Sequence, residues 1–189
     1  MSPRTTEIVR QPLAVANRSR RRWDQHLVRF PRVVAFVARV LWRIYLFLPP
    51  RSRLRRAMLR TFVGRSFEAL NRGDFEATFT LYHADVESIM PPELSSLGIE
   101  PVFQGRKARV DFQERWNTEW GNWWFEGKEL IDLGDDRVLI TGFARGSGSR
   151  SGAVVGNECA FLFTVSGGQA IRERIFLDHD EAFKAAGLR

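Results

Sequence analysis

The sequence has little of the two residues that most often build metal sites and nucleophilic catalytic centres. It contains one cysteine, Cys159, and three histidines, His26, His83 and His179. A single cysteine excludes an internal disulfide, and the sequence has neither a cysteine cluster nor an H-E-x-x-H motif. We therefore expect no metal and no cofactor, and we interpret Cys159 as a small core residue.

A long uncharged apolar run is also missing. A membrane-spanning helix needs about 20 largely uncharged residues. Arginines interrupt the apolar residues 26–48, so the longest uncharged runs there are residues 33–38 and 44–50. The first 22 residues are basic, and neither an apolar signal region nor a small-residue cleavage site follows them. We therefore predict neither a transmembrane helix nor a signal peptide.

Lysine is absent from the first 65 residues, although this region is strongly basic. It holds 16 arginines against two acidic residues, which gives a net charge of +14. Residues 66–189 hold 13 basic and 20 acidic residues, which gives −7. The basic character of the chain therefore belongs to its N-terminal third.

This basic region divides into an arm, residues 1–22, and an apolar helix predicted over residues 26–48. Pro49 and Pro50 end the helix, because proline lacks the backbone donor and restricts the preceding residue. Two interpretations stay open. The helix packs on its own domain or on a second copy of the chain, or it lies on an anionic membrane surface with Trp42 and Tyr45 at headgroup depth.

A second helix is predicted over residues 51–70, and arginines crowd its first half. We interpret these arginines as a solvated or lipid-facing cluster: Arg51, Arg53, Arg55, Arg56 and Arg60. Nucleic acid is disfavoured as a partner, because no helix-turn-helix, zinc-finger or RNP signature accompanies the charge. We place the domain boundary after residue 50, with residues 1–50 as arm and amphipathic helix and residues 51–189 as the main domain.

Residues 66–87 organise the rest of the chain. Gly73 is suited to end the helix because glycine adopts the left-handed C-terminal conformation, and Asp74 then caps a short second helix. Phe75, Phe79 and Tyr82 form an apolar stripe on that helix. Downstream, the pattern predicts a strand at 86–90, a loop at 91–101, a helix at 105–119, strands at 123–133, 137–145, 153–165 and 170–177, and a final helical turn at 180–186. This order predicts an α+β fold.

Residues 66–87 resemble the opening of NTF2-like superfamily domains in their SnoaL-like, polyketide-cyclase-like branch. The resemblance continues in order through residues 103–106, 129–135, 167–168, 177–182 and 185–188, and it covers residues 54–188. It implies an NTF2-like cone, in which a curved antiparallel sheet wraps around helices and encloses an apolar pocket, with an extra helix at the N-terminus here.

The resemblance also implies where chemistry would occur. SnoaL-like cyclases carry an acid/base aspartate at the end of the last strand, where this sequence has Asp178. The alternative is that Asp178 caps the C-terminal helix. Those cyclases also place a histidine on the preceding strand, and residues 153–165 contain none. Our candidates for ligand binding are Tyr82, Trp120, Asn157, Phe161 and Arg174, with core or dimer packing as the alternative for the tryptophans.

Two functions follow as hypotheses. The first is a protein that binds a small apolar molecule in its cone cavity, forms a homodimer, and associates with an anionic membrane surface through residues 29–60. The second is a cofactor-free isomerase, cyclase or epoxide-hydrolase-type enzyme that uses Asp178. We favour the first, because the histidine is missing. We expect a cytoplasmic protein, either free or peripheral on the membrane.

Overall fold

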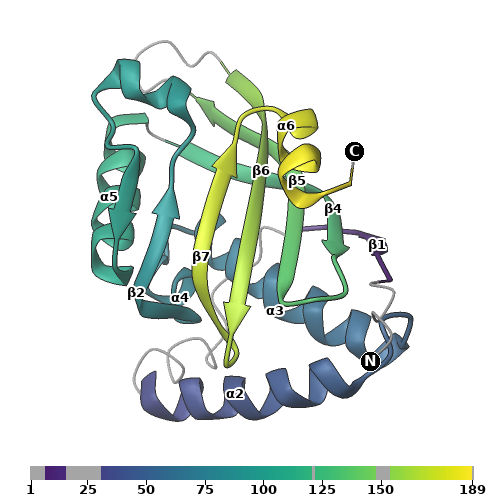
Figure 1. Ribbon diagram of the computed structural model, residues 1–189. Coiled ribbons are helices and arrows are strands. Elements are labelled where there is room, and N and C mark those ends of the chain that lie inside the picture. Colours follow the sequence, from purple (N-terminus) through teal and green to yellow (C-terminus); the bar gives the residue numbers. More distant parts are fainter. Residues whose placement is uncertain (1–6, 16–30, 121, 148–153, 189) are drawn as a thin grey trace.

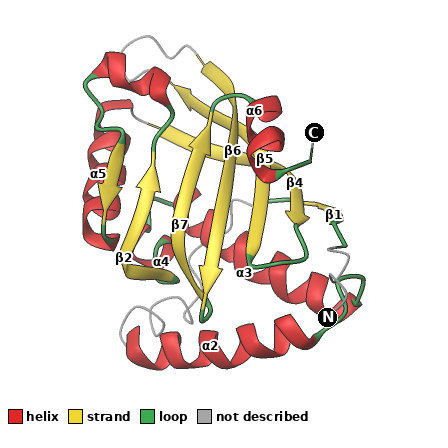
Figure 2. Ribbon diagram, in the orientation of Figure 1, coloured by secondary structure: helices red, strands yellow, loops and turns green. Residues whose placement is uncertain are grey.

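A computed structural model describes residues 7–15, 31–120, 122–147 and 154–188 (Figures 1 and 2). The elements follow in the order β1 (Val9–Pro12), α2 (Pro31–Phe47), α3 (Arg53–Asn71), α4 (Phe75–Thr78), β2 (Tyr82–Ile89), the 3-10 helix η1 (Pro92–Leu97), β3 (Val102–Gln104), α5 (Arg106–Trp120), β4 (Asn122–Asp132), β5 (Arg137–Ser147), β6 (Val154–Ser166), β7 (Gln169–Phe176) and α6 (His179–Ala186). The predicted α+β architecture is confirmed.

The strands form one curved sheet with the order β1-β4-β5-β6-β7-β2-β3. Neighbouring strands are antiparallel except for β2 and β7, which run parallel. Helices α3, α4 and α5 lie against one face, which we call the inner face, and α6 packs on the opposite, outer face (Figure 1). This is the cone that the resemblance implies, a curved sheet around helices.

Alternation along the strands separates two layers of core. On β6, Cys159 and Phe161 belong to the inner core with Phe67 and Phe125, whereas Ala160 belongs to the outer core beneath α6. A residue's parity in its strand therefore decides whether its side chain faces the cone interior or α6.

The turn predicted before α4 from Gly73 and Asp74 is present in the structure. Asp74 accepts a hydrogen bond from the Ala77 backbone at the start of α4, and Gly73 has φ of 72°. Strand β2 begins at Tyr82, four residues before the predicted strand, and η1 occupies part of the predicted loop 91–101. The other predicted helix and strand ends downstream of residue 50 lie within about two residues of the observed ones, as is usual for element boundaries.

The described parts of the N-terminal region, residues 7–15 and α2, contact the rest of the domain. Within the residues assigned to the basic arm, Val9–Pro12 forms β1, which pairs antiparallel with residues 129–132 of β4. Leu13 and Tyr45 are both buried in the inner core. Residues on both sides of the boundary expected after residue 50 therefore belong to one core cluster. None of the described helices combines the length and hydropathy needed to cross a membrane.

Candidate functional site

The cone contains two cavities that meet at a common wall. The α2 cavity, of about 130 Å³, lies between α2, α3 and the inner face of the sheet. The α5 cavity, of about 250 Å³, lies between α5, η1 and the ends of β4–β7. Leu70, Arg109 and Phe161 line both cavities.

Apolar side chains make up most of the α2 cavity. Helix α2 contributes Leu41, Trp42 and Tyr45, while α3 and the strands supply most of the remaining wall. The rings of Phe67 and Phe161, which both line this cavity, pack against each other with centroids 5.2 Å apart. Such a wall favours an apolar molecule or apolar part of a molecule.

The α5 cavity combines aromatic and polar groups. Phe112, Gln113 and Trp116 reach it from α5, and Asn157 and Cys159 reach it from β6. Burial, followed by the nearby Glu173 carboxylate, raises the pKa of the Cys159 thiol to about 12. The thiol is therefore protonated at neutral pH and is a poor nucleophile.

A buried polar group occupies the wall between the cavities. Glu173, 1% exposed on β7, accepts hydrogen bonds from the Tyr82 hydroxyl at 2.8 Å and from Arg109 Nε at 2.8 Å. Arg109 Nη1 donates to the Gln113 side-chain oxygen at 2.9 Å. The opposite charges of Arg109 and Glu173 compensate each other, which makes their burial tolerable.

The electrostatics keep Tyr82 neutral and Arg109 charged. Burial and then the Glu173 carboxylate raise the pKa of Tyr82 well above its usual value. Burial lowers the pKa of Arg109, but Glu173 and Tyr82 outweigh this effect and raise it above the usual value. Tyr82 can therefore act as a hydrogen-bond donor and Arg109 as a permanent cation.

Arg109 retains donor capacity for a guest. Its guanidinium lies 4.6 Å from the Phe79 ring centroid, and its Nη2 makes no hydrogen bond to the described residues. Ser88 pairs with Glu173 across β2 and β7, and its buried hydroxyl likewise has no partner among the described residues. A carbonyl, carboxylate or phenolate oxygen in the cavity would satisfy Arg109 Nη2.

Asp178, the predicted acid/base residue, lies elsewhere. It is exposed at the start of α6, where its carboxylate accepts hydrogen bonds from the backbone N–H groups of Asp180 at 2.6 Å and Glu181 at 3.0 Å. These bonds lower its pKa. It lines neither cavity. The structure therefore assigns Asp178 the capping role that was the alternative interpretation.

The predicted ligand-binding residues are not all brought together. Tyr82 and Phe161 line the α2 cavity, and Phe161 and Asn157 line the α5 cavity. Arg174 is exposed, lies over the Phe176 ring at 4.7 Å and lines neither cavity. Trp120 ends α5, and its side chain lies outside the described part of the structure.

Sequence reasoning missed Glu173, Arg109 and Gln113. On β7, Arg174 and Phe176 share the outer parity, whereas Glu173 has the opposite parity and faces the cone interior. The sequence holds one signal for this site, which is on α5. Arg109 and Gln113 are four residues apart and therefore lie on one helix face, next to the apolar Phe112.

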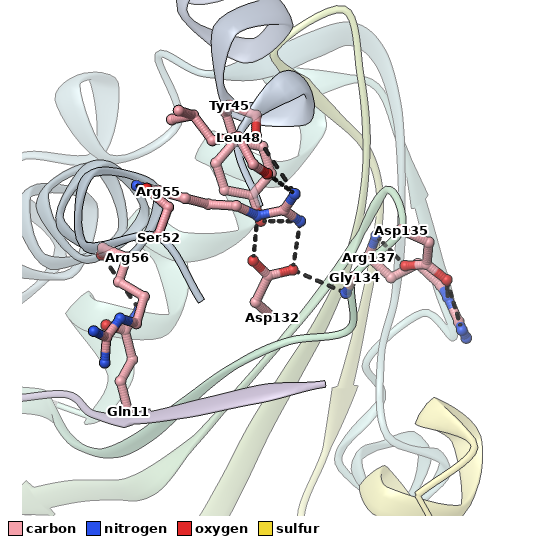
Figure 3. Close-up of polar contacts among 10 residues, drawn as sticks. All are labelled: Gln11, Tyr45, Leu48, Ser52, Arg55, Arg56, Asp132, Gly134, Asp135 and Arg137. Carbon is pink, nitrogen blue, oxygen red and sulfur yellow. Dashed lines mark hydrogen bonds and ion pairs between the residues drawn. The ribbon is translucent and has the colours of Figure 1, made fainter. Parts of the chain in front are cut away.

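A second buried ion pair lies away from the wall that both cavities share. Arg55 is 2% exposed and binds both Asp132 oxygens, through Nε at 2.7 Å and Nη2 at 3.0 Å. Figure 3 draws these contacts as dashed lines. Arg55 also donates to the backbone oxygen of Leu48 at 3.1 Å and to the Tyr45 hydroxyl at 3.3 Å. The interpretation of Arg55 as part of a solvated cluster is therefore wrong, because this arginine ties the end of α2 to α3 and β4.

The described residues contain no group of three or more histidine, cysteine, aspartate or glutamate side chains that could hold a metal ion. The described walls of the two cavities offer hydrogen bonds, one buried ion pair and apolar contacts.

Comparison with solved structures supports the same fold. TerC, crystallised with polyporic acid, aligns with a TM-score of 0.56 at 20% identity, over 67% of this chain and 96% of TerC. A putative SnoaL-like polyketide cyclase from Jannaschia sp. CCS1 aligns with a TM-score of 0.56 at 17% identity, over 75% of this chain and 99% of the cyclase. A protein of ketosteroid isomerase-like fold from Catenulispora acidiphila, in complex with trimethylamine, aligns with a TM-score of 0.53 at 16% identity, over 68% of this chain and 93% of that protein.

At these identities the similarity establishes the fold and not the activity. No curated protein matches the chain significantly in sequence. The family model of the SnoaL-like domain matches residues 63–173, more than half of the chain and most of the cone. On this match and this fold, the chain belongs to the SnoaL-like domain family.

Proposed function

We propose that this protein binds a small, mainly apolar molecule across the two cavities and holds an oxygen of that molecule at Arg109. The observation that carries the proposal is the buried guanidinium in the shared cavity wall, with its Nη2 group unsatisfied by the described residues. A ligand oxygen that accepts a hydrogen bond from Nη2 would gain a charge-assisted bond, which is stronger than a bond between neutral groups.

The sizes of the cavities suit a ring-containing molecule. An apolar cavity of about 150 Å³ is known to hold benzene. The α2 cavity, at about 130 Å³, is of this order, and the α5 cavity, at about 250 Å³, is larger. An aromatic or polyketide-like molecule with one carbonyl or acidic oxygen fits this combination, and the polyporic acid in TerC supports the same class.

A thermal-shift screen tests this proposal. The wild type is compared with Arg109→Met against lipophilic ketones, aromatic acids, epoxides and their hydrocarbon analogues. A ligand that binds only the folded protein raises the melting temperature by mass action. We expect oxygen-bearing ligands to shift the wild type more than their hydrocarbon analogues, and this difference to disappear in Arg109→Met.

The matched control is Arg137→Met. Arg137 is partly exposed, pairs with Asp135 at 2.9 Å and lines neither cavity, so this variant should retain the ligand preference. Equal shifts for ketones and hydrocarbons in the wild type would contradict the role of Arg109. No shift with any compound would contradict binding itself.

The alternative is a cofactor-free isomerase, cyclase or epoxide-hydrolase-type enzyme. Asp178 is exposed and lines neither cavity, and Cys159, although it lines the α5 cavity, is a protonated thiol and therefore a poor nucleophile. The carboxyl group that lines the α2 cavity is Glu173, which accepts hydrogen bonds from Tyr82 and Arg109. Turnover of a screening hit that is lost in Glu173→Gln and retained in Asp178→Asn would favour this alternative.

Two further parts of the proposal concern partners. The exposed apolar residues of α2 and the neighbouring arginines support peripheral attachment to an anionic membrane surface. The homodimer remains a prediction from the sequence, and light scattering over a range of protein concentrations would test it.

A further inference from the structure

Helix α2 has two apolar faces with different surroundings. Its inner face carries Leu41, Trp42 and Tyr45, which line the α2 cavity. Its outer face, defined by Phe36, Val37, Val40, Ile44 and Phe47, is exposed to solvent, with Phe36 64% and Phe47 89% exposed. One helix thus separates the cavity from an apolar surface patch.

The charge around the outer face is of one sign. Arg39 and Arg43 are exposed on α2 beside the patch, and neither forms an ion pair with a described residue. The sequence contains no aspartate or glutamate between Asp24 and Glu68, whereas ten arginines lie in this interval. An apolar helix face bordered by arginines matches the boundary between anionic headgroups and acyl chains.

The attachment of α2 to the domain is uneven. Within the described residues, Arg55 donates the side-chain hydrogen bonds that connect α2 to the rest of the domain, and Tyr45 accepts them. Arg55 also donates to the backbone oxygen of Leu48, just beyond the helix. Nearer the middle of the helix, Leu41 and Trp42 face the cavity and make apolar contacts. Apolar contacts with a cavity are those that an apolar guest can replace at low cost.

We propose that the outer face of α2 docks on an anionic bilayer surface, and that a lipophilic ligand passes from the bilayer around α2 into the α2 cavity. This inference rests on the proposed binding function, because it names the source and the class of the ligand. The ligand is a membrane-partitioned apolar molecule with one oxygen acceptor, which crosses from acyl chains to an apolar wall with little exposure to water.

Vesicle flotation with the full chain tests the docking step. We use phosphatidylcholine vesicles with and without 30% phosphatidylglycerol, and expect binding to the anionic vesicles that weakens as salt is added. Phe36→Ser with Phe47→Ser, and separately Arg39→Gln with Arg43→Gln, should each lower the partition coefficient by about tenfold or more. These side chains are exposed, so the variants should keep the wild-type circular dichroism spectrum.

Two control variants test whether the loss of vesicle binding depends on where the residue lies or only on the type of residue removed. Val102→Ser removes an exposed apolar side chain from β3, at the far edge of the sheet, and Lys107→Gln removes an exposed cation from α5. Both controls should bind anionic vesicles as the wild type does. An equal loss in these controls would overturn the assignment of the patch to α2.

Stopped-flow transfer of 6-propionyl-2-(dimethylamino)naphthalene, a fluorescent lipophilic ketone, tests the second step. The probe is preloaded into vesicles, and its arrival in the cavity is followed by energy transfer from tryptophan. We expect transfer to the wild type to be about tenfold faster from anionic than from neutral vesicles, and this ratio to fall towards one in both α2 variants. Their affinity for the probe free in solution should stay unchanged.

The outcomes distinguish this inference from the binding proposal. Probe binding in solution without vesicle binding leaves the binding proposal intact and overturns the inference. Vesicle binding with equal transfer rates from both vesicle types overturns the route around α2. Concentration-dependent dimerisation that Phe47→Ser abolishes, without any vesicle binding, would assign the outer face to a second copy and overturn lipid docking.

Discussion

Arg55 and Arg109 are both almost fully buried, and each lies against a carboxylate, yet their remaining donors differ. Arg55 binds both oxygens of Asp132, and its other hydrogen bonds reach Tyr45 and Leu48 (Figure 3). Arg109 makes a single hydrogen bond to Glu173 and one to Gln113, its Nη2 group makes none to the described residues, and its side chain lines both cavities.

This difference separates a structural pair from a candidate binding pair. A buried pair whose donors are all used has nothing to offer a ligand, and it fixes the elements that it joins. A pair in a cavity wall with an unused hydrogen-bond donor can still form a hydrogen bond to a ligand. Burial and ion pairing alone therefore do not identify a site, whereas unused hydrogen-bonding capacity beside a cavity does.

The largest effect is expected for Asp132→Asn. This change leaves the Arg55 charge buried without its carboxylate, and breaking a buried pair typically costs about 3–5 kcal/mol of unfolding free energy. It also weakens the attachment of α2, because Arg55 links Asp132 to Tyr45 and Leu48. Urea unfolding followed by circular dichroism measures this loss.

The exposed pair Arg172–Glu87 provides the control, since Glu87→Gln breaks an ion pair of 2.7 Å that is largely open to water. Exposed pairs contribute about 0–1 kcal/mol, so this variant should stay near the wild type. A similar loss in both variants would contradict the structural role that we assign to Arg55 and Asp132.

Glu173→Gln should give a smaller loss of stability and a change in ligand preference. Glutamine keeps one oxygen that can accept the Arg109 Nε hydrogen bond, and its NH2 group can donate to the Tyr82 hydroxyl oxygen. Arg109 also lines both cavities. We therefore expect about 1–3 kcal/mol of destabilisation. The uncompensated charge of Arg109 should then favour carboxylate ligands over the corresponding ketones.

Isothermal titration with a matched acid and ketone measures this preference. Asp132→Asn should leave the acid-to-ketone ratio of affinities at the wild-type value, whereas Glu173→Gln should raise the ratio. If both variants lose stability equally and neither changes the ratio, then the distinction between the two pairs fails.

The order of elements could be predicted from the sequence because its signals are local. Asp74 and Gly73 mark the turn before α4, and the strands from β4 to β7 follow from apolar runs separated by turn residues. Strand β1 could not be predicted in the same way. Its four residues, VRQP, lack apolar alternation, and the strand exists because β4 offers a free edge.

The site was harder to predict than the order of elements, because it depends on which side chains of a strand face the cone interior. Strand alternation correctly groups Arg174 with Phe176, but alternation does not say whether that face meets the cavity or α6. Moving an assignment by one residue along a strand exchanges the two faces of the sheet. In the structure it is therefore Glu173, and not its neighbour Arg174, whose side chain is buried in the interior. Arg55 shows the same limit on a helix, since only the distant Asp132 explains why one arginine of a basic run is buried.

The smallest effect is expected for Asp178→Ala, the residue for which the resemblance and the structure differ most. Its pKa is lowered by the hydrogen bonds from the Glu181 and Asp180 backbones, so the ionised form is favoured in the folded state. The carboxylate thus contributes stability at pH values above the unfolded pKa of about 3.9. This contribution is lost as the pH falls through the lower pKa of the folded protein.

Wild type and Asp178→Ala should therefore differ slightly in melting temperature at pH 7 and converge at acidic pH, where the carboxyl is protonated in both states. Asp178→Asn should lie close to the wild type at pH 7, because asparagine also caps helices well. Ligand binding should be unchanged in both variants, because Asp178 lines neither cavity. Loss of ligand binding in Asp178→Asn, with its melting temperature intact, would return this residue to the site and would place the chemistry at the C-terminal end of β7, away from Arg109.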